Sequence, residues 1–155
     1  MLKISIIQIG KTKEKWITEA ESEYLKRLSI NAQVKIQTLK PQTRFQSSAE
    51  VKSKEADLII GAIPEKSFII ILDETGHQFT SLQFAQKIEQ ITTQGNSHLT
   101  FIIGGAFGLY QKVKQHADLI LSFSKFTFTH EMIRPLLLEQ IYRAFTIIQN
   151  KTYHY

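Results

Sequence analysis

The 155-residue sequence contains no cysteine, and this absence excludes disulfide bonds, thiolate metal sites and cysteine nucleophiles. It is typical of proteins from a reducing compartment. The five histidines show no paired spacing such as HExxH, so the sequence also predicts no transition-metal site. No apolar run is long enough to span a bilayer, and the first one, residues 2–9, is not followed by the small residues of a signal-peptide cleavage site. Together these absences predict a cytoplasmic protein with no membrane contact.

The chain also lacks internal repeats, low-complexity tracts and the composition shifts that mark a linker, so residues 1–155 are expected to form a single domain. A chain of this length typically buries about 70% of its unfolded surface, which is enough for a full core. The net charge of +5 favours an anionic partner such as nucleic acid. Acidic residues are mixed among the basic ones, so composition alone is only a mild indication of RNA or DNA.

Short apolar runs alternate along the chain with longer segments in which apolar residues recur every three or four positions. Short apolar runs are typical of buried strands, and they occupy residues 2–9, 67–72, 99–103 and 118–123. Residues 33–39 alternate apolar and polar side chains, as a strand near a sheet edge does. Apolar residues at spacings of three and four predict helices over residues 13–28, 49–63, 80–91 and 130–150, and a shorter helix over 109–115. The alternation predicts an α/β fold, with a largely parallel sheet and helices on both faces.

Three of the expected strands end in unusual loops, which are DETG (73–76), GGAFG (104–108) and SFSKFTFTH (122–130). In an open sheet these ends are expected to cluster into one crevice that can enclose a small molecule. The spacing GGxxG matches neither the dinucleotide fingerprint nor the phosphate loop. Taken alone, the glycine turn is as compatible with a plain tight turn as with a binding loop.

The same loops carry a family resemblance that extends over the whole chain. Its parts are LDxxG at 72–76, IGGxxG at 103–108, LSFSKFTFTH at 121–130, Arg134, EQIYRAF at 139–145 and the Tyr153-His154 ending. In this order and spacing the sequence resembles the large-subunit ribosomal RNA methyltransferase H family, within the SPOUT class of S-adenosylmethionine-dependent enzymes. No single motif is decisive, and the match is specific because all of them occur together.

The resemblance implies a SPOUT-type α/β knot, with a deep trefoil knot in the carboxyl half, and a homodimer. Topological rules alone would argue against a knot. It also implies methylation of N3 of a pseudouridine in 23S rRNA, in the large subunit of assembled ribosomes, with S-adenosylmethionine as cofactor. Two alternatives remain open, namely a SPOUT methyltransferase with another RNA target and a catalytically silent ribosome-binding factor.

Carried over position by position, the resemblance implies cofactor contacts at Leu72, Gly104, Phe123, Ser124, Lys125, Phe126, Thr127 and Phe128. Two positions depart from the family pattern. Many members have proline where this chain has Thr129, and the variable pair inside the glycine turn is Ala106-Phe107 rather than a polar one. Main-chain and apolar contacts to the cofactor tolerate both changes. The shape of the substrate entrance is not predicted by the resemblance.

Pseudouridine N3 belongs to an imide that must lose its proton, and His130 is the candidate catalytic base because histidine titrates near neutral pH. The alternative is that His130 caps the long helix, and geometry must decide. Arg134 lies one helical turn further on the same face, so we expect it to act with His130 and to contact RNA phosphate or base. Arg143 is about half a turn out of phase with Arg134, which favours a structural or dimer salt bridge.

The tail of Tyr153, His154 and Tyr155 is either a frayed end or, as the resemblance implies, a segment that completes the neighbouring subunit's site. In the second case its aromatic residues stack on unpaired bases, and His154 joins the catalytic residues. Asp73 and Glu74 either favour the sulfonium charge or are solvated turn residues. Candidate contacts to the rRNA backbone, each also explicable as ordinary solvated surface, are Lys3, Lys11, Lys13, Lys15, Arg44 and Lys125.

Overall fold

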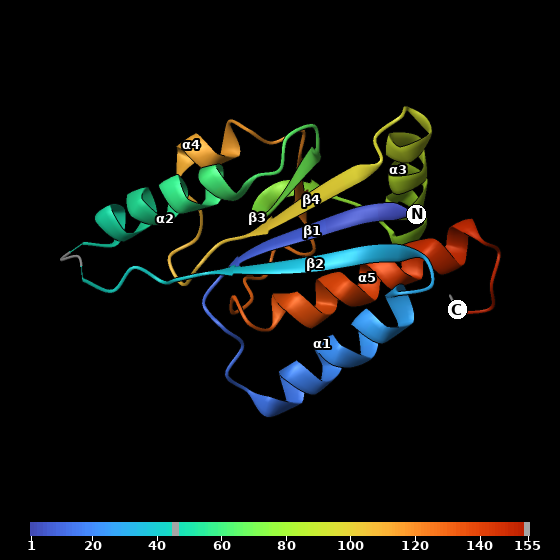
Figure 1. Ribbon diagram of the computed structural model, residues 1–155, viewed down its shortest axis with the longest axis horizontal. Coiled ribbons are helices and arrows are strands. Elements are labelled where there is room, and N and C mark those ends of the chain that lie inside the picture. The colour runs from blue at the N-terminus through green and yellow to red at the C-terminus, as the bar shows by residue number, and fades with distance from the viewer. Residues whose placement is uncertain (45–46, 154–155) are drawn as a thin grey trace.

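The computed structural model describes residues 1–44 and 47–153 and has one five-stranded sheet in which every pairing is parallel. The strand order is β2-β1-β4-β3-β5 (Figure 1). In chain order the elements are β1 (Leu2–Ile9), α1 (Lys15–Leu28), β2 (Ala32–Leu39), α2 (Ser48–Ala62), β3 (Phe68–Gln78), α3 (Ser81–Thr93), β4 (His98–Ile103), α4 (Gln111–Lys114), β5 (Leu119–Ser122) and α5 (Ile133–Ile148). The α/β fold with a parallel sheet is therefore confirmed.

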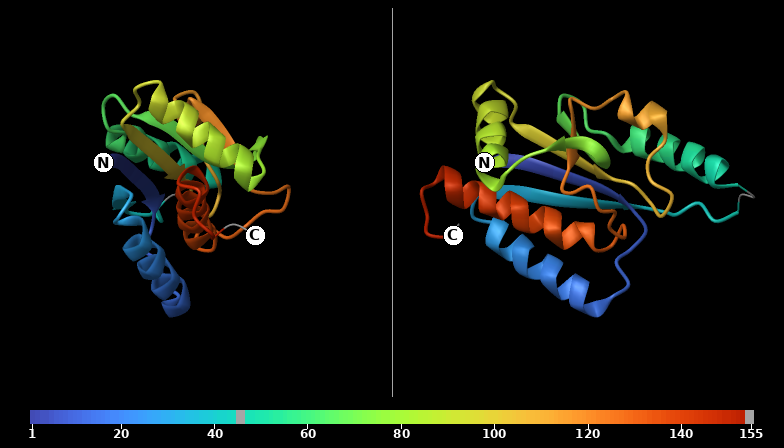
Figure 2. Two further views of the ribbon diagram at one scale, coloured as in Figure 1. Left: turned by 90° about the vertical axis from the view of Figure 1, so that its right-hand side faces the viewer. Right: turned by 180° about the vertical axis from the view of Figure 1, so that it is seen from behind.

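Helices cover both faces of the sheet, as the alternating pattern predicts (Figure 2). On one face α1, α3 and α5 bury a large apolar cluster that includes Leu28, Phe84 and Leu137. On the other face α2 and α4 bury a smaller cluster that includes Ile59 and Val113. The continuous apolar runs of β1 and β4 place these strands inside the sheet, because both of their faces must be covered.

β2 is an edge strand, and its alternating sequence explains why it tolerates that place. Val34 and Ile36 pack against the larger core, whereas Lys35 and Gln37 are exposed. A charged, half-polar edge strand does not invite pairing with another chain.

β3 is longer than expected, because the DETG segment continues the strand instead of ending it. β5 pairs with β3 up to Leu72 and again at His77, with an irregularity between them. A Cβ on Gly76 would lie 2.6 Å from the carbonyl oxygen of Ile120, so only glycine lets the two strands approach here. The sequence shows the glycine but not the neighbouring strand that requires it.

The helix ends follow local chemistry. The expected capping box at the start of α3 is confirmed, since Thr80 Oγ1 accepts from the Gln83 amide and the Gln83 side chain accepts from the Thr80 amide. α5 begins at Ile133 rather than at residue 130, after a turn in which the Met132 amide donates to Thr129 Oγ1. Within the described ranges, no helix is long and apolar enough to cross a membrane. The trefoil knot stays a prediction.

Candidate functional site

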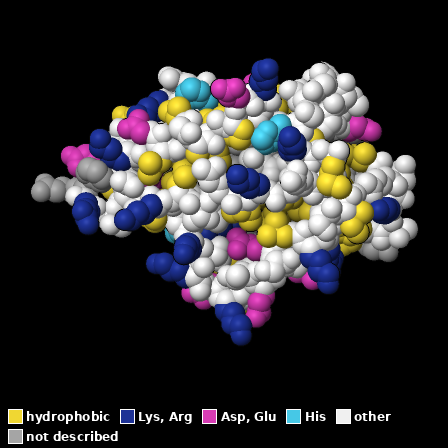
Figure 3. Space-filling view, in the orientation of Figure 1, with side chains coloured by type: hydrophobic (Ala, Val, Ile, Leu, Met, Phe, Trp, Pro, Cys, Tyr) yellow, Lys and Arg dark blue, Asp and Glu magenta, His cyan; other side chains and the backbone are white. Residues whose placement is uncertain are grey.

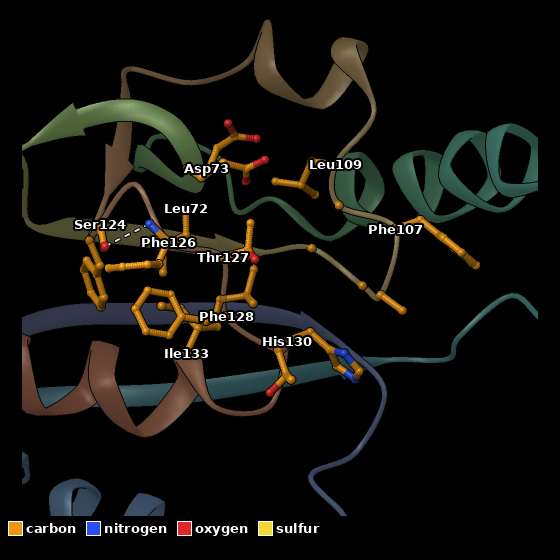
Figure 4. Close-up of a pocket in the computed structure, with 18 of the residues that line it drawn as sticks. Leu72, Asp73, Phe107, Leu109, Ser124, Phe126, Thr127, Phe128, His130 and Ile133 are labelled. Carbon is orange, nitrogen blue, oxygen red and sulfur yellow. Dashed lines mark hydrogen bonds between the residues drawn. The ribbon is translucent and has the colours of Figure 1, made fainter.

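A cavity of about 570 Å³ opens beside residues 72–74 in the middle of β3 and at the carboxyl ends of β4 and β5 (Figure 4). This volume lies within the range of ligand pockets, roughly 300–1,000 Å³. All three segments that the sequence singles out contribute to its wall, although DETG lies within β3 rather than after it. The lining residues come from residues 72–74, 103–109, 121, 123, 124, 126–130 and 133.

The glycine turn is fixed by the space around it. The Gly108 amide donates to the Gly105 carbonyl at 3.0 Å, and Gly108 has a φ of 77°, which favours glycine. A Cβ on Gly104 would lie 2.9 Å from Leu109 Cγ, and one on Gly105 would lie 2.8 Å from Glu55 Oε2. The glycines at 104 and 105 therefore keep the turn itself compact. Side chains there would strike the protein before they reached a ligand.

The aromatic loop after β5 is held by hydrogen bonds of its own. Ser122 Oγ donates to the Ser124 carbonyl at 2.9 Å, and the Phe126 amide donates to Ser124 Oγ at 3.0 Å. Leu72, Phe126, Phe128 and Ile133 gather on one side of the cavity (Figure 4). These side chains give the cavity an apolar wall.

The predicted cofactor contacts are brought together with one exception. The lining includes Leu72, Gly104, Phe123, Ser124, Phe126, Thr127 and Phe128. Lys125 is exposed and is not among the lining residues. The cofactor contact expected at Lys125 is therefore not supported by this geometry.

Asp73 also lines the cavity and forms an ion pair with Lys114, whose Nζ lies 2.5 Å from Asp73 Oδ2. Burial raises its pKa, but hydrogen bonds from Lys114 and Thr75 outweigh burial and hold the pKa of Asp73 below its usual value. The carboxylate is thus charged and already matched by a cation. Glu74 lines the same cavity from an exposed position.

His130 lines the cavity beyond the apolar wall, and its ring turns away from Phe128 (Figure 4). Burial lowers the pKa of His130, and the positive charges of Arg134 and Lys13 lower it further. The imidazole is therefore neutral at pH 7 and able to accept a proton. The N-cap of α5 is Met132 without a side-chain cap, so His130 does not cap this helix.

Arg134 does not line the cavity but is enclosed within this chain, so its expected contact with RNA beside His130 stays a prediction. It is 2% exposed, and its guanidinium donates to the carbonyls of Ile9 and Gly10, at 2.7 and 2.9 Å, and to Thr12 Oγ1 at 2.9 Å. Thr12 in turn donates to Glu21. A spacing of four residues predicted that Arg134 shares a helical face with His130. In the structure the loop after β1 covers Arg134.

The two ends of α5 separate the tail from the cavity. A helix of 16 residues is about 24 Å long, and Tyr153 follows its C-terminal end whereas Ile133 at its start lines the cavity. Tyr153 packs edge-on against Tyr142 with ring centroids 4.9 Å apart, and Arg143 lies 5.0 Å from its centroid. The tail thus begins far from the cavity of its own chain. His154 and Tyr155 lie outside the described residues.

Tyr153 has a polar neighbourhood as well. Its pKa is raised to about 12 by burial and by the hydrogen bond with Tyr24, so its hydroxyl keeps its proton. Arg143 Nη2 lies 2.6 Å from Glu139 Oε1, an ion pair within α5 that agrees with the expected structural salt bridge.

Sequence reasoning missed Glu55 and several apolar lining residues. Glu55 is 5% exposed, supports Gly105 from behind and accepts a long hydrogen bond from the Gln42 amide. Nothing in the α2 sequence distinguishes Glu55 from its solvated neighbours. Leu109 and Ile133 also line the cavity. Only their positions in the sequence, beside the glycine turn and the aromatic loop, could have indicated this.

The parallel sheet, its two helical layers and a cavity at the carboxyl ends of β4 and β5 define an α/β protein of the class that binds small ligands at that end of the sheet. Residues 2–154 match the family described as "Predicted SPOUT methyltransferase". The chain belongs to the SPOUT methyltransferase family.

Several relatives cover the full chain. The protein named ribosomal RNA large subunit methyltransferase H from Ruminiclostridium cellulolyticum is 44% identical over 158 residues, covering 99% of each chain. The protein of the same name from Halothermothrix orenii is also 44% identical, with the same coverage. A similar solved structure is that of a probable methylase family protein from Haemophilus influenzae Rd KW20, with a TM-score of 0.57 over 99% of this chain and 70% of that one. At 13% identity, this last similarity concerns the fold alone.

Proposed function

We propose that this protein is an S-adenosylmethionine-dependent methyltransferase that modifies N3 of a pseudouridine in 23S rRNA of the large ribosomal subunit. The observation that carries the proposal is the cavity in which the three family motifs meet. Full-length relatives named as methyltransferases of large-subunit ribosomal RNA support the choice of substrate.

The cavity suits the donor by its chemistry. Apolar side chains such as Leu72, Leu109 and Phe128 can enclose an adenine ring, and the main chain of the glycine turn is accessible beside them. Glu74 contributes an exposed carboxylate to the lining, whereas Asp73 is neutralised by Lys114. We therefore assign the attraction of the donor's positive charge to Glu74 rather than to Asp73.

The remaining residues would orient the reactants and move the proton. S-adenosylmethionine, when bound, supplies a methyl group on a sulfonium, which is already activated for transfer. Holding reactants in line can lower a barrier by roughly 7–11 kcal/mol, so positioning by the cavity walls is the main catalytic task. The neutral imidazole of His130 would take the imide proton. Arg134 acts as a positioning residue, because it fixes residues 9–12 beside the segment that carries His130.

We further propose a homodimer in which the tail of each subunit completes the site of the other. Phe128, Met132 and Leu136 lie four residues apart and are 43%, 37% and 37% exposed, and Phe126 is 82% exposed. Exposed apolar side chains gathered in the segment before α5 and in its first turn are suited to burial against a second copy. Because Tyr153 lies at the far end of α5, a tail that includes His154 and Tyr155 reaches a cavity most simply from the neighbouring subunit.

The test is methyl transfer to ribosomes from a strain that lacks the corresponding enzyme. We expect the purified protein to add one methyl group to pseudouridine N3 of 23S rRNA, detected by mass spectrometry of nuclease fragments. A methyl group on another nucleotide would favour the SPOUT enzyme with a different target. Binding to ribosomes without any transfer would favour the silent ribosome-binding factor.

A further inference from the structure

Phe107 stands at the tip of the glycine turn, and its ring has no packing role in the fold. It is 56% exposed and belongs to neither apolar core. Its ring points away from the other labelled side chains around the cavity (Figure 4). Phe107 therefore borders the mouth of the cavity while presenting its ring to the outside.

The turn constrains the backbone that carries this ring. Gly105 and Gly108 close the turn by a hydrogen bond, and the Glu55 carboxylate supports Gly105 from the side of α2. These features require glycines at both ends of the turn and nothing specific at its tip. A large apolar ring on a rigid, exposed tip is not explained by folding, whereas it is typical of a contact to a partner.

The neighbouring loops are basic. The loop after β1 contains Lys11 and Lys13, and the loop after β2 contains Lys40 and Arg44, all of them exposed. These loops adjoin one another and the glycine turn, because a Cβ on Gly10 would lie 3.2 Å from Pro41 Cγ, and the Gln42 amide donates to the Glu55 carboxylate behind Gly105. Dark-blue Lys and Arg side chains gather around α2 and these loops (Figure 3).

Residues 10–14 and 40–44 of the two loops carry four exposed basic side chains and one exposed acidic side chain, Glu14. Glu55 is buried, and Glu131 accepts hydrogen bonds from the Lys13 and Glu14 amides. Glu14 itself is exposed. Lys13 is close enough to His130 to act on it electrostatically, so the basic loops reach the rim of the cavity itself.

We propose that Phe107 is a base-stacking residue, which holds an unpaired nucleobase beside the target nucleotide while the lysines and Arg44 of the two basic loops contact the RNA backbone. An exposed aromatic ring amid positive charge is the arrangement by which proteins bind single-stranded nucleic acid. This inference rests on the proposed function and adds to it a substrate-positioning residue at the mouth of the donor cavity, with its ring directed outward.

The experiment compares four variants in methyl transfer to ribosomes, each also titrated with S-adenosylmethionine and analysed by sedimentation. Phe107→Ala removes the ring, Phe107→Leu keeps apolar bulk without a ring, and Phe107→Trp keeps a ring. Ile30→Ala is the control, because Ile30 is 77% exposed and precedes β2 at the amino-terminal ends of the parallel strands, whereas the glycine turn lies at their carboxyl ends.

We expect Phe107→Ala and Phe107→Leu to lower kcat/KM for ribosomes by roughly 5- to 150-fold, the range of a lost base stack. Phe107→Trp and Ile30→Ala should stay near wild type, and donor affinity and oligomeric state should be unchanged in all four. Full activity of Phe107→Ala would overturn the proposal, and so would full activity of Phe107→Leu. Weaker donor binding would assign the ring to the donor pocket, and loss of the dimer would assign it to the subunit interface.

Failure of the proposed function would look different. Wild-type protein that transfers no methyl group to any rRNA would overturn that function and this role together. Active wild type beside an unimpaired Phe107→Ala overturns the stacking role alone.

Discussion

At the scale of single residues, His130 and Arg134 lie only four positions apart but in two different environments. His130 borders the cavity, whereas Arg134 is enclosed by the loop after β1. The buried cation also acts on its neighbour, because its charge adds to burial in lowering the pKa of His130. Burial first, and the charge of the arginine second, favour the neutral form of the candidate base.

The pH dependence of methyl transfer tests His130. Its pKa is lowered below the ordinary 6.5, so the active neutral form persists through pH 7 and the rate should fall only as the pH drops below 6.5. His130→Gln should lower kcat by roughly 100- to 10,000-fold and remove this acid limb. His116→Gln is the control, since His116 is exposed and does not line the cavity. An unchanged acid limb in His130→Gln would show that another group accepts the proton.

At the scale of elements, the first turn of α5 and the loop after β1 are joined into one unit. The buried guanidinium of Arg134 donates hydrogen bonds to this loop. At the surface, Glu131 Oε2 accepts a hydrogen bond from the Lys13 amide at 3.0 Å. The second contact also satisfies an amide near the start of α1. One short segment thus fixes the His130 region, the basic loop and the start of α1 together.

Arg134→Gln should break this unit. Buried acceptors left without a donor cost roughly 1–3 kcal/mol each, so we expect the unfolding temperature to fall by about 5–10 °C. Arg44→Gln, an exposed arginine on the loop after β2, should change stability by no more than about 0.5 kcal/mol. Calorimetric unfolding of both variants measures the difference. Equal stability of the two variants would contradict the role of Arg134 in joining α5 to the loop after β1.

Local patterns predicted most elements because periodicity and capping are properties of short segments. The capping box of α3 and the edge position of β2 are examples. The extension of β3 through Gly76 depends on β5, and the burial of Arg134 depends on residues more than a hundred positions earlier. The cavity was predictable from three strand ends, but Glu55 was not, since only folding brings it to Gly105.

At the scale of the whole molecule, a single chain does not bring the tail to its own cavity. Removal of residues 153–155 should leave donor affinity within about twofold of wild type, because none of the described lining residues is lost. Methyl transfer should fall at least tenfold, because the aromatic tail that stacks on bases is gone. Titration and single-turnover assays separate these two effects.

Mixed dimers extend this test. A tail-less subunit keeps its cavity, and a His130→Gln subunit keeps its tail. Random mixing of the two inactive variants should restore up to about a quarter of wild-type activity, since half of the dimers then hold one complete site of two. No restoration would contradict a shared site.

The central claim is that the cavity between residues 72–74, 103–109 and 121–133 holds the methyl donor. Equilibrium binding of radiolabelled S-adenosylmethionine, with and without ribosomes, tests it most directly. We predict one saturable site per cavity with micromolar or tighter affinity, and its loss in a variant with Leu109→Glu, which introduces a charge into the apolar wall. Absence of saturable binding under both conditions, or wild-type affinity in Leu109→Glu, would contradict the claim.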